Sequence, residues 1–276
     1  ELGEFAIRDG SVSISDPAGD TTVSHLGFSL GASITGSTVD VNGIDLDVDL
    51  DAPIDQQISM DGGLVLSGGD LSLALDSIRL GDIGVAISGA IKQAETTPNL
   101  DLTILVDPID AGTVAALAGE AVFREDAKLA VAITGPLSDI GVDATLTSVS
   151  EQGSLGLSVQ ADLEAEPMTW AVALEPDQFA VDALTEMVPP PFLLNGRYAL
   201  SGSGTEYPTG LEATIEMEGT DQVFAGEVVP HLSIRGQLSG GQFRLDGIDV
   251  DHSAAKIAVS GDVDLLKSLA ELDIAA

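Results

Sequence analysis

The chain has 276 residues and carries 45 acidic against 10 basic side chains, a formal net charge of −35. This balance excludes a nucleic-acid partner, because neutralising phosphates requires clustered Lys and Arg. The absence of Cys excludes disulfides and thiolate chemistry. Apolar residues make up 44% of the chain and aromatic residues only 4%, so the surface available for burial is aliphatic. Together with the 31 Gly residues, this composition favours a β-rich fold.

The acidity has three competing explanations: a solvated outer face of a long sheet, a salty habitat, or a requirement for divalent cations. No apolar run reaches the roughly 18 residues needed to cross a bilayer, and no signal peptide is present. The sequence opens inside a strand-like pattern at Glu1. We therefore expect it to be a piece of a longer chain, with any membrane anchor outside the piece.

The N-terminal part of the chain predicts three hairpins. Asp9-Gly10 would form a two-residue loop that pairs Ile7 with Val12 and Phe5 with Ile14. A slightly longer loop is expected at residues 61–63. Asn42-Gly43, the strongest of these signals, would pair Val41 with Ile44 and Val39 with Leu46, because both loop residues accept positive φ.

Residues 44–51 alternate strictly between apolar residues and aspartates. Ile44, Leu46, Val48 and Leu50 would therefore share one face of a strand, and the aspartates the other. An EF-hand would need a Gly and a later Glu that neither register supplies. Aspartates on one face of one strand also lie about 6.6–6.8 Å apart, too far to clamp one ion. Only Asp40 and Asp45, adjacent across the predicted hairpin, could share a cation.

Similar alternation predicts strands through most of the remaining chain up to Val263, with short helical stretches at residues 109–117, 181–187 and 265–272. Short motifs recur at spacings of 67 to 69 residues, as in Ile133-Thr134-Gly135 and Leu200-Ser201-Gly202. We predict a single elongated repetitive domain over residues 1–276, with units near 68–134, 135–201 and 202–276.

Catalytic and cofactor chemistry finds no support in the sequence. The three histidines are isolated, no Gly-x-Ser-x-Gly nucleophile elbow occurs on a strand–turn–helix, and Ser201-Gly202-Ser203-Gly204 lacks the Gly-Lys-Ser/Thr of a phosphate loop. One Trp and two Tyr are too few to form the aromatic platforms of a sugar site. We expect no enzyme activity, no catalytic residue, no metal and no cofactor.

Two parts of the sequence resemble a known family. The pattern of apolar residues around Asp9-Gly10 in residues 5–16 is similar to a hairpin of bacterial AsmA-like proteins. Residues 133–140 and 193–265 resemble TamB repeats, in particular Ile234-Arg235-Gly236-Gln237-Leu238, Phe243-Arg244-Leu245 and Val259-Ser260-Gly261-Asp262-Val263. TamB is the inner-membrane subunit of the translocation and assembly module. The resemblance covers most of the chain and transfers no catalytic residue.

The resemblance implies an all-β fold: an elongated, curved antiparallel sheet that forms an open trough (a β-taco) with a hydrophobic interior. It implies a periplasmic location, with the full-length protein tethered to the bacterial inner membrane, and an outer-membrane barrel partner of the Omp85 type. The implied function is phospholipid transport between the two membranes and outer-membrane biogenesis. An aliphatic groove suits acyl chains, since each buried methylene contributes about 0.8 kcal/mol.

Two alternatives remain open at this point. One is a scaffold or chaperone for outer-membrane β-barrel assembly or autotransporter secretion, which would bind strands by its edges. The other is a calcium-dependent, adhesin-like array of β-sandwiches. The residues expected to line a lipid groove are Phe5, Ile7, Val12, Ile14, Val39, Val41, Ile44, Leu46, Val48, Leu50, Ile87, Ile91, Ile133, Leu137, Ile234, Leu238, Phe243, Leu245, Val259 and Val263.

Overall fold

The protein is all-β, as predicted. The computed structural model describes residues 3–16, 19–52, 56–118, 123–150, 153–185, 188–206, 209–252, 255–267 and 269–275. These residues contain nineteen strands and two short helices, and the strands form open antiparallel sheet. The chain divides into two compact units, Glu1–Pro136 and Leu137–Ala276.

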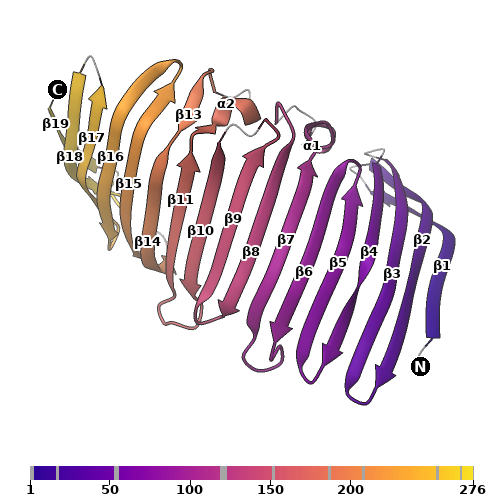
Figure 1. Ribbon diagram of the computed structural model, residues 1–276. Helices are drawn as coiled ribbons and strands as arrows, with labels where there is room; N and C mark the ends of the chain where they lie inside the picture. The colour runs from indigo at the N-terminus through magenta and orange to yellow at the C-terminus, as the bar shows by residue number, and fades with distance from the viewer. Residues whose placement is uncertain are drawn as a thin grey trace. The chain divides into compact units, whose positions relative to one another are not determined.

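Unit 1 is a meander in which each strand pairs antiparallel with the next along the chain (Figure 1). No other pairing joins its strands in the described residues, so the sheet of this unit is not closed into a barrel. Some connections are short turns that contain Gly, such as Gly68-Gly69 and Gly81-Asp82, whereas a helix lies between β7 and β8. The strands are β1 (Gly3–Asp16), β2 (Gly19–Thr35), β3 (Thr38–Ala52), β4 (Gln56–Ser67), β5 (Asp70–Leu80), β6 (Ile83–Lys92), β7 (Asn99–Ile109) and β8 (Ala127–Pro136).

The three predicted hairpins are wrong. Asp9-Gly10, Asn42-Gly43 and residues 61–63 each lie inside a long strand, and each coincides with a shift in the pairing register. In β3, for example, the chain advances three residues from Val41 to Ile44 while β4 advances only two. The positive φ that predicted a turn is present at both Gly43 (57°) and Asp9 (54°), but it is used in a β-bulge.

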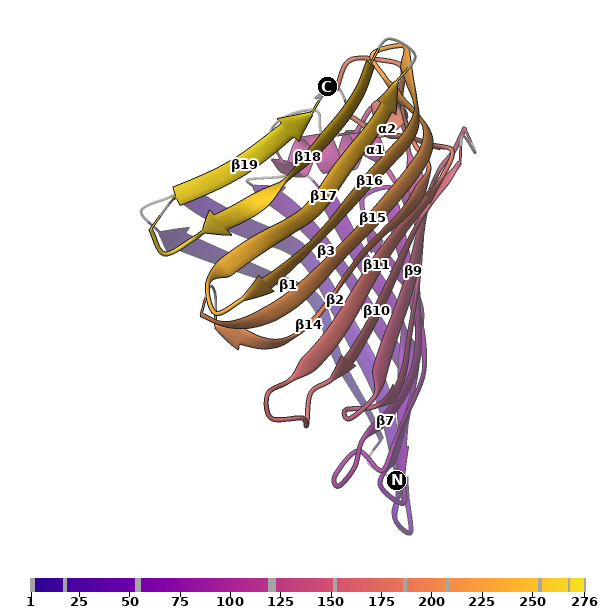
Figure 2. The same ribbon diagram turned by 90° about the vertical axis from the view of Figure 1, so that its left-hand side faces the viewer.

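Unit 2 is also an antiparallel sheet, and its longest strands bend along their length (Figure 2). Strand β11 pairs with β14, the short β12 pairs with β13, and β13 pairs in turn with β15. The strands are β9 (Ile140–Ser148), β10 (Ser154–Asp162), β11 (Thr169–Asp177), β12 (Phe179–Ala180), β13 (Phe192–Leu194), β14 (Gly196–Glu206), β15 (Gly210–Phe224), β16 (Glu227–Ser239), β17 (Gln242–His252), β18 (Ala255–Asp264) and β19 (Leu269–Ala275).

A small packed core occupies the end of unit 2 around β12, β13 and β15. Phe179 and Ala180 are each 4% exposed and Leu184 is 6% exposed, while the rings of Phe192 and Phe224 meet edge to face with centroids 5.0 Å apart. Aromatic burial of this kind is the largest hydrophobic contribution that single side chains can make. This corner is therefore packed like a globular core, although it lies in an otherwise thin sheet.

A polar network closes the same corner. The side chain of Gln222 is completely buried, and its amide oxygen accepts hydrogen bonds from the Tyr198 hydroxyl (3.1 Å) and the Asn195 backbone N–H (3.3 Å). Its amide nitrogen donates to the Asn195 carbonyl oxygen. Burial raises the pKa of Tyr198, and the Gln222 hydrogen bond partly opposes that shift. A buried amide needs such partners, because an unmet polar group costs about 1–3 kcal/mol.

Two of the three predicted helical stretches are present. Helix α1 (Ala111–Ala118) and helix α2 (Val181–Leu184) follow β7 and β12 respectively. Asp110 caps α1 by accepting a hydrogen bond from the Thr113 backbone N–H at 2.5 Å. The predicted helical turn at 265–272 is wrong: a turn over residues 265–267 leads into strand β19, whose alternation of Leu272 and Ile274 with acids has a strand period.

Candidate functional site

The candidate site of unit 1 is one continuous aliphatic surface. The register places apolar side chains opposite one another from strand to strand: Leu66 faces Leu71, which faces Ile91, which faces Leu100. Directly opposed residues of antiparallel strands lie on the same side of the sheet. We call this surface the apolar face of unit 1; it comprises Phe5, Ile7, Phe28, Leu30, Val39, Val41, Ile44, Leu46, Val48, Ile58, Met60, Leu64, Leu66, Leu71, Leu73, Leu75, Ile78, Leu80, Ile83, Val85, Ile87, Ile91, Leu100, Leu102, Ile104, Val106, Leu129, Val131 and Ile133.

The bulges preserve this face. Side chains alternate along a regular strand, so one inserted residue would move every later side chain to the opposite face. A bulge absorbs the inserted residue and prevents this reversal. In β3 the three-residue step from Val41 to Ile44 matches the two-residue step from Leu64 to Gly62, so Val41 and Ile44 stay on one side. The bulges thus bend long strands while the aliphatic surface remains unbroken.

Within unit 1, no second layer covers this apolar face in the residues that the structure describes. Its side chains are mostly half-buried by their strand neighbours, and only Val48, at 7% exposure, is fully buried. Phe5 and Ile7, on the edge strand, are 56% and 39% exposed. A sandwich would bury such a face against a second sheet. An uncovered aliphatic surface of this extent is typical of a binding site.

Unit 2 carries an equivalent surface. Leu157 faces Leu174 across β10 and β11, and Ile234 faces Ile248 across β16 and β17. Glycines interrupt this surface at Gly202, Gly236 and Gly261. We call it the apolar face of unit 2; it comprises Val142, Ala144, Leu146, Leu155, Leu157, Val159, Trp170, Val172, Leu174, Tyr198, Leu200, Ala213, Ile215, Met217, Leu232, Ile234, Leu238, Phe243, Leu245, Ile248, Val250, Ile257, Val259, Val263, Leu272 and Ile274.

The predicted groove residues fall almost entirely on these two faces. Leu137 is the exception, because it lies in the turn after β8 and not on a strand. Three further predicted residues, Val12, Ile14 and Leu50, belong to strands, but the structure does not describe their side chains. The remaining predicted residues lie on the apolar face of their own unit.

The described aspartates of β3, which are Asp40, Asp45, Asp47 and Asp49, lie on the opposite, polar face. Asp47 accepts a hydrogen bond from the Gln57 amide at 3.0 Å, and His25 lies 3.1 Å from Asp49. The predicted proximity of Asp40 and Asp45 across a hairpin is wrong, since both belong to the single strand β3. Within the described part of the chain no group of three or more His, Cys, Asp and Glu side chains is placed to hold a metal ion.

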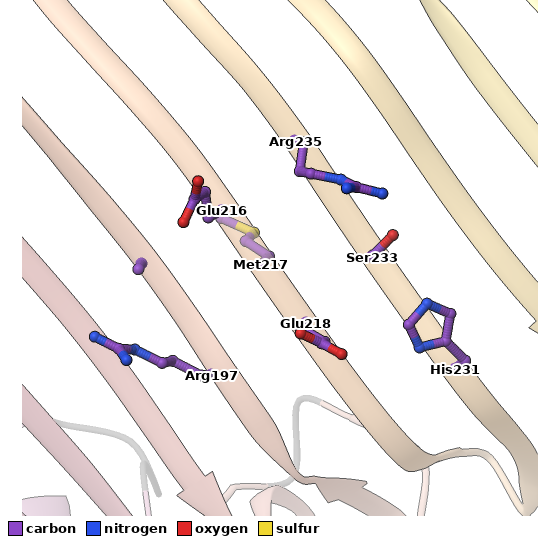
Figure 3. A pocket seen from close by; sticks show the side chains of 8 residues that line it. Arg197, Glu216, Met217, Glu218, His231, Ser233 and Arg235 are labelled. Atoms are coloured by element: carbon purple, nitrogen blue, oxygen red, sulfur yellow. The ribbon is translucent and has the colours of Figure 1, made fainter.

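The polar face of unit 2 contains a hollow of about 530 Å³ that the sequence did not predict (Figure 3). Arg197 lies opposite Glu218, and Glu216 lies opposite Arg235, so charges alternate across β14, β15 and β16. Arg197 also pairs with Glu175 (Nε to Oε1, 3.4 Å). The residues that line the hollow come from β14, β15 and β16, and they are brought together only by the pairing register of these three strands. The opposite charges neutralise one another, and the side chains of both arginines are mostly exposed.

Comparisons with protein-family models, curated proteins and solved structures find no match to this chain. Among the described residues, neither helix is long and apolar enough to cross a membrane. The function must therefore be argued from the two apolar faces.

Proposed function

We propose that the chain is a lipid-binding β-sheet segment of a TamB/AsmA-like protein, acting in the periplasm in phospholipid transport and outer-membrane biogenesis. The observation that carries the proposal is the aliphatic surface of each unit, which is continuous in unit 1 and interrupted by glycines in unit 2. In unit 1 it extends over all eight strands, and its side chains are left half-buried. The family resemblance in the sequence supplies the cellular setting and the outer-membrane barrel partner.

The chemistry of the faces fits acyl chains. Their side chains are Leu, Ile, Val and Ala with few aromatics, and they offer no charged anchor for a head group. Each methylene that leaves water contributes about 0.8 kcal/mol whatever its position in the acyl chain. A surface without polar anchors therefore binds lipid tails without fixing their register, which permits movement along the sheet.

The distribution of charge also supports lipid binding by the apolar face. The acidic side chains alternate with the apolar ones, as in residues 44–49, so they gather on the face away from the lipid. An anionic outer face remains hydrated, and its net charge opposes association between copies through that face. The apolar face is then the surface left for a ligand.

The test is to introduce a charge on the apolar face and to compare it with the same charge on the polar face. Ile87→Asp lies at the centre of the apolar face of unit 1, whereas Val65 points to the polar face and is 37% exposed. We expect Ile87→Asp to reduce phospholipid that co-purifies with the chain, measured by mass spectrometry. Val65→Asp is the matched control and should leave the amount unchanged, provided that circular dichroism shows both variants folded.

Photo-crosslinking gives an independent readout. A photoreactive residue at position 87 or 234 should label phospholipid, and one at position 88 or 235, one step along the same strands, should not. If the unaltered chain carries no phospholipid and neither inward position labels lipid, the proposal is wrong. Labelling of protein instead would favour the scaffold alternative.

A further inference from the structure

The chain contains two Asn-Gly pairs, Asn42-Gly43 inside β3 and Asn195-Gly196 at the start of β14. In such a pair the side-chain amide is open to attack by the backbone nitrogen that follows it, because glycine has no Cβ to obstruct the ring that forms. Whether the attack occurs in a folded chain depends on how freely the peptide between the two residues can turn. The structure holds the two pairs in very different ways.

The first pair lies at the bulge of β3. Asn42 lies opposite Gly31 of β2, but Gly43 has no opposed residue in either β2 or β4. Apart from its chain neighbours, no atom lies within 4 Å of a Cβ placed on Gly43. Both residues of the pair are exposed, and they border a hollow of about 600 Å³ on the polar face. The peptide between them therefore has room to turn, and water reaches it.

The second pair is held by hydrogen bonds on its side chain and on its backbone. The side-chain nitrogen of Asn195 donates to the carbonyl oxygen and to the hydroxyl of Thr220, both at 3.2 Å. The backbone N–H and the carbonyl oxygen of Asn195 are both bonded to the buried amide of Gln222. Gly196 is crowded as well, because a Cβ placed on it would clash with the Glu218 carbonyl oxygen. This peptide turns only when several hydrogen bonds break.

We propose that Asn42 is a site of spontaneous deamidation in the folded protein, and that Asn195 is protected from the same reaction. The Gly43 backbone nitrogen loses its proton and attacks Cγ of Asn42, and the new C–N bond closes a succinimide ring. The bond from Cγ to the side-chain nitrogen breaks, and ammonia leaves with a proton. Water then opens the ring at either carbonyl group, which gives aspartate or isoaspartate at position 42. The reaction consumes only water.

The product changes the polar face of unit 1. Asp40 and Asp45 lie on either side of Asn42 along this face of β3, so deamidation adds a negative charge between two carboxylates. Isoaspartate also adds one carbon atom to the main chain, and a bulge is the part of a strand that takes up extra length. The apolar face lies on the other side of the sheet, so this proposal does not depend on lipid binding.

Hydroxylamine tests the difference between the two pairs, because it cleaves a chain at a succinimide. In the folded chain it should cut after Asn42 and leave Asn195-Gly196 intact, whereas in denaturant it should cut at both. We expect cleavage of the folded chain at Asn195 to be slower by about a hundredfold, since at least two hydrogen bonds must break first. Asn42→Gln is the matched control and should abolish the first cut. Equal rates at the two pairs, or cleavage only in denaturant, would overturn the proposal.

A second experiment tests why Asn195 is protected. Gln222→Ala removes the partners of the Asn195 backbone, and Thr220→Val removes one acceptor of its side chain with a smaller change to the fold. Each should raise deamidation at position 195 by about tenfold and leave the rate at position 42 unchanged. Incubation in water enriched in heavy oxygen, followed by peptide mass spectrometry, measures both positions, because the new carboxyl group carries the label. If Thr220→Val stays folded and neither variant speeds the reaction at position 195, the proposed protection is wrong.

Discussion

The two units share one strand pattern but differ in how they are stabilised. Of the hydrophobic side chains that are fully buried among the described residues, only Val48 and Ala127 belong to unit 1. Unit 2 has Phe179, Ala180, Leu184, Ala213, Leu238 and Leu245. Unit 1 therefore depends on its ladder of strands and on half-buried aliphatic contacts, whereas unit 2 adds a packed corner. The comparison indicates that a ladder of paired strands with half-buried aliphatic contacts can keep a long apolar face open without a packed core.

The largest expected effect comes from removing a ring of the packed corner. Phe179→Ala should destabilise unit 2 by about 3–5 kcal/mol, because the side chain is 4% exposed and leaves a cavity. Phe5→Ala, the same change at a side chain that is 56% exposed in unit 1, should cost less than about 1 kcal/mol. Urea denaturation measures both. Equal losses would show that unit 1 has an equivalent core.

The next effect should come from the buried amide. Gln222→Ala removes the acceptor of the Tyr198 hydroxyl and of the Asn195 backbone N–H, which should cost about 1–3 kcal/mol. Gln160→Ala is the matched control in the same unit, because its amide donates to Asp139 at 2.7 Å in an exposed position. We expect that change to stay within about 0.5 kcal/mol. If thermal unfolding shows that the two variants lose a similar free energy of unfolding, the buried hydrogen bonds of Gln222 do not stabilise the unit more than an exposed one does.

A smaller effect is expected at a bulge of unit 1. Gly43 has φ 57°, and no other group lies within 4 Å of a Cβ placed there, so the cost of Gly43→Ala is conformational. We expect a loss of about 1 kcal/mol. Gly27→Ala, where the added Cβ meets only ordinary contacts at 3.7 Å and 3.9 Å, should be neutral or slightly stabilising. Denaturation that ranks Gly27→Ala as the costlier change would contradict the bulge assignment.

The smallest effect concerns the cap of α1. The Thr113 hydrogen bonds hold the pKa of Asp110 below its ordinary value of 3.8, so folding favours the ionised carboxylate. The ionised carboxylate contributes fully to the free energy of unfolding above pH 3.8, and this contribution is lost as the pH falls through the lower pKa of the folded state. Asp110→Ala should cost about 0.5–1 kcal/mol at pH 7. The difference from the unaltered chain should shrink in denaturation series below pH 4; a difference that grows there would reverse the assignment.

The sequence predicts the strands and the apolar faces well, because side-chain alternation is a local property of the backbone. It does not predict whether Asn42-Gly43 makes a turn or a bulge. A two-residue hairpin would pair Val41 with Ile44, and the observed bulge also keeps these two residues on one face. The apolar pattern is therefore identical for both, and the distinction depends on long-range pairing with β2 and β4.

The hollow and the packed corner were missed for a related reason. Arg197, Glu216 and Arg235 meet only through the register of three strands, and nothing in their separate segments indicates it. Gln222 lies in a strand whose alternation gives no sign that its side chain is buried. The alternation of apolar and polar residues predicts surfaces that repeat from strand to strand. It does not predict contacts that occur only once in the fold.

The neighbour-to-neighbour pairing of unit 1 also bears on how it folds and how it could be altered. When every strand contacts only the strands before and after it in the chain, loop closure is cheap and folding can begin at any hairpin. Stability then grows nearly in proportion to strand number. Deleting an adjacent pair such as β4 and β5 would leave β3 and β6 antiparallel, so the sheet can change length by whole hairpins while keeping one aliphatic side.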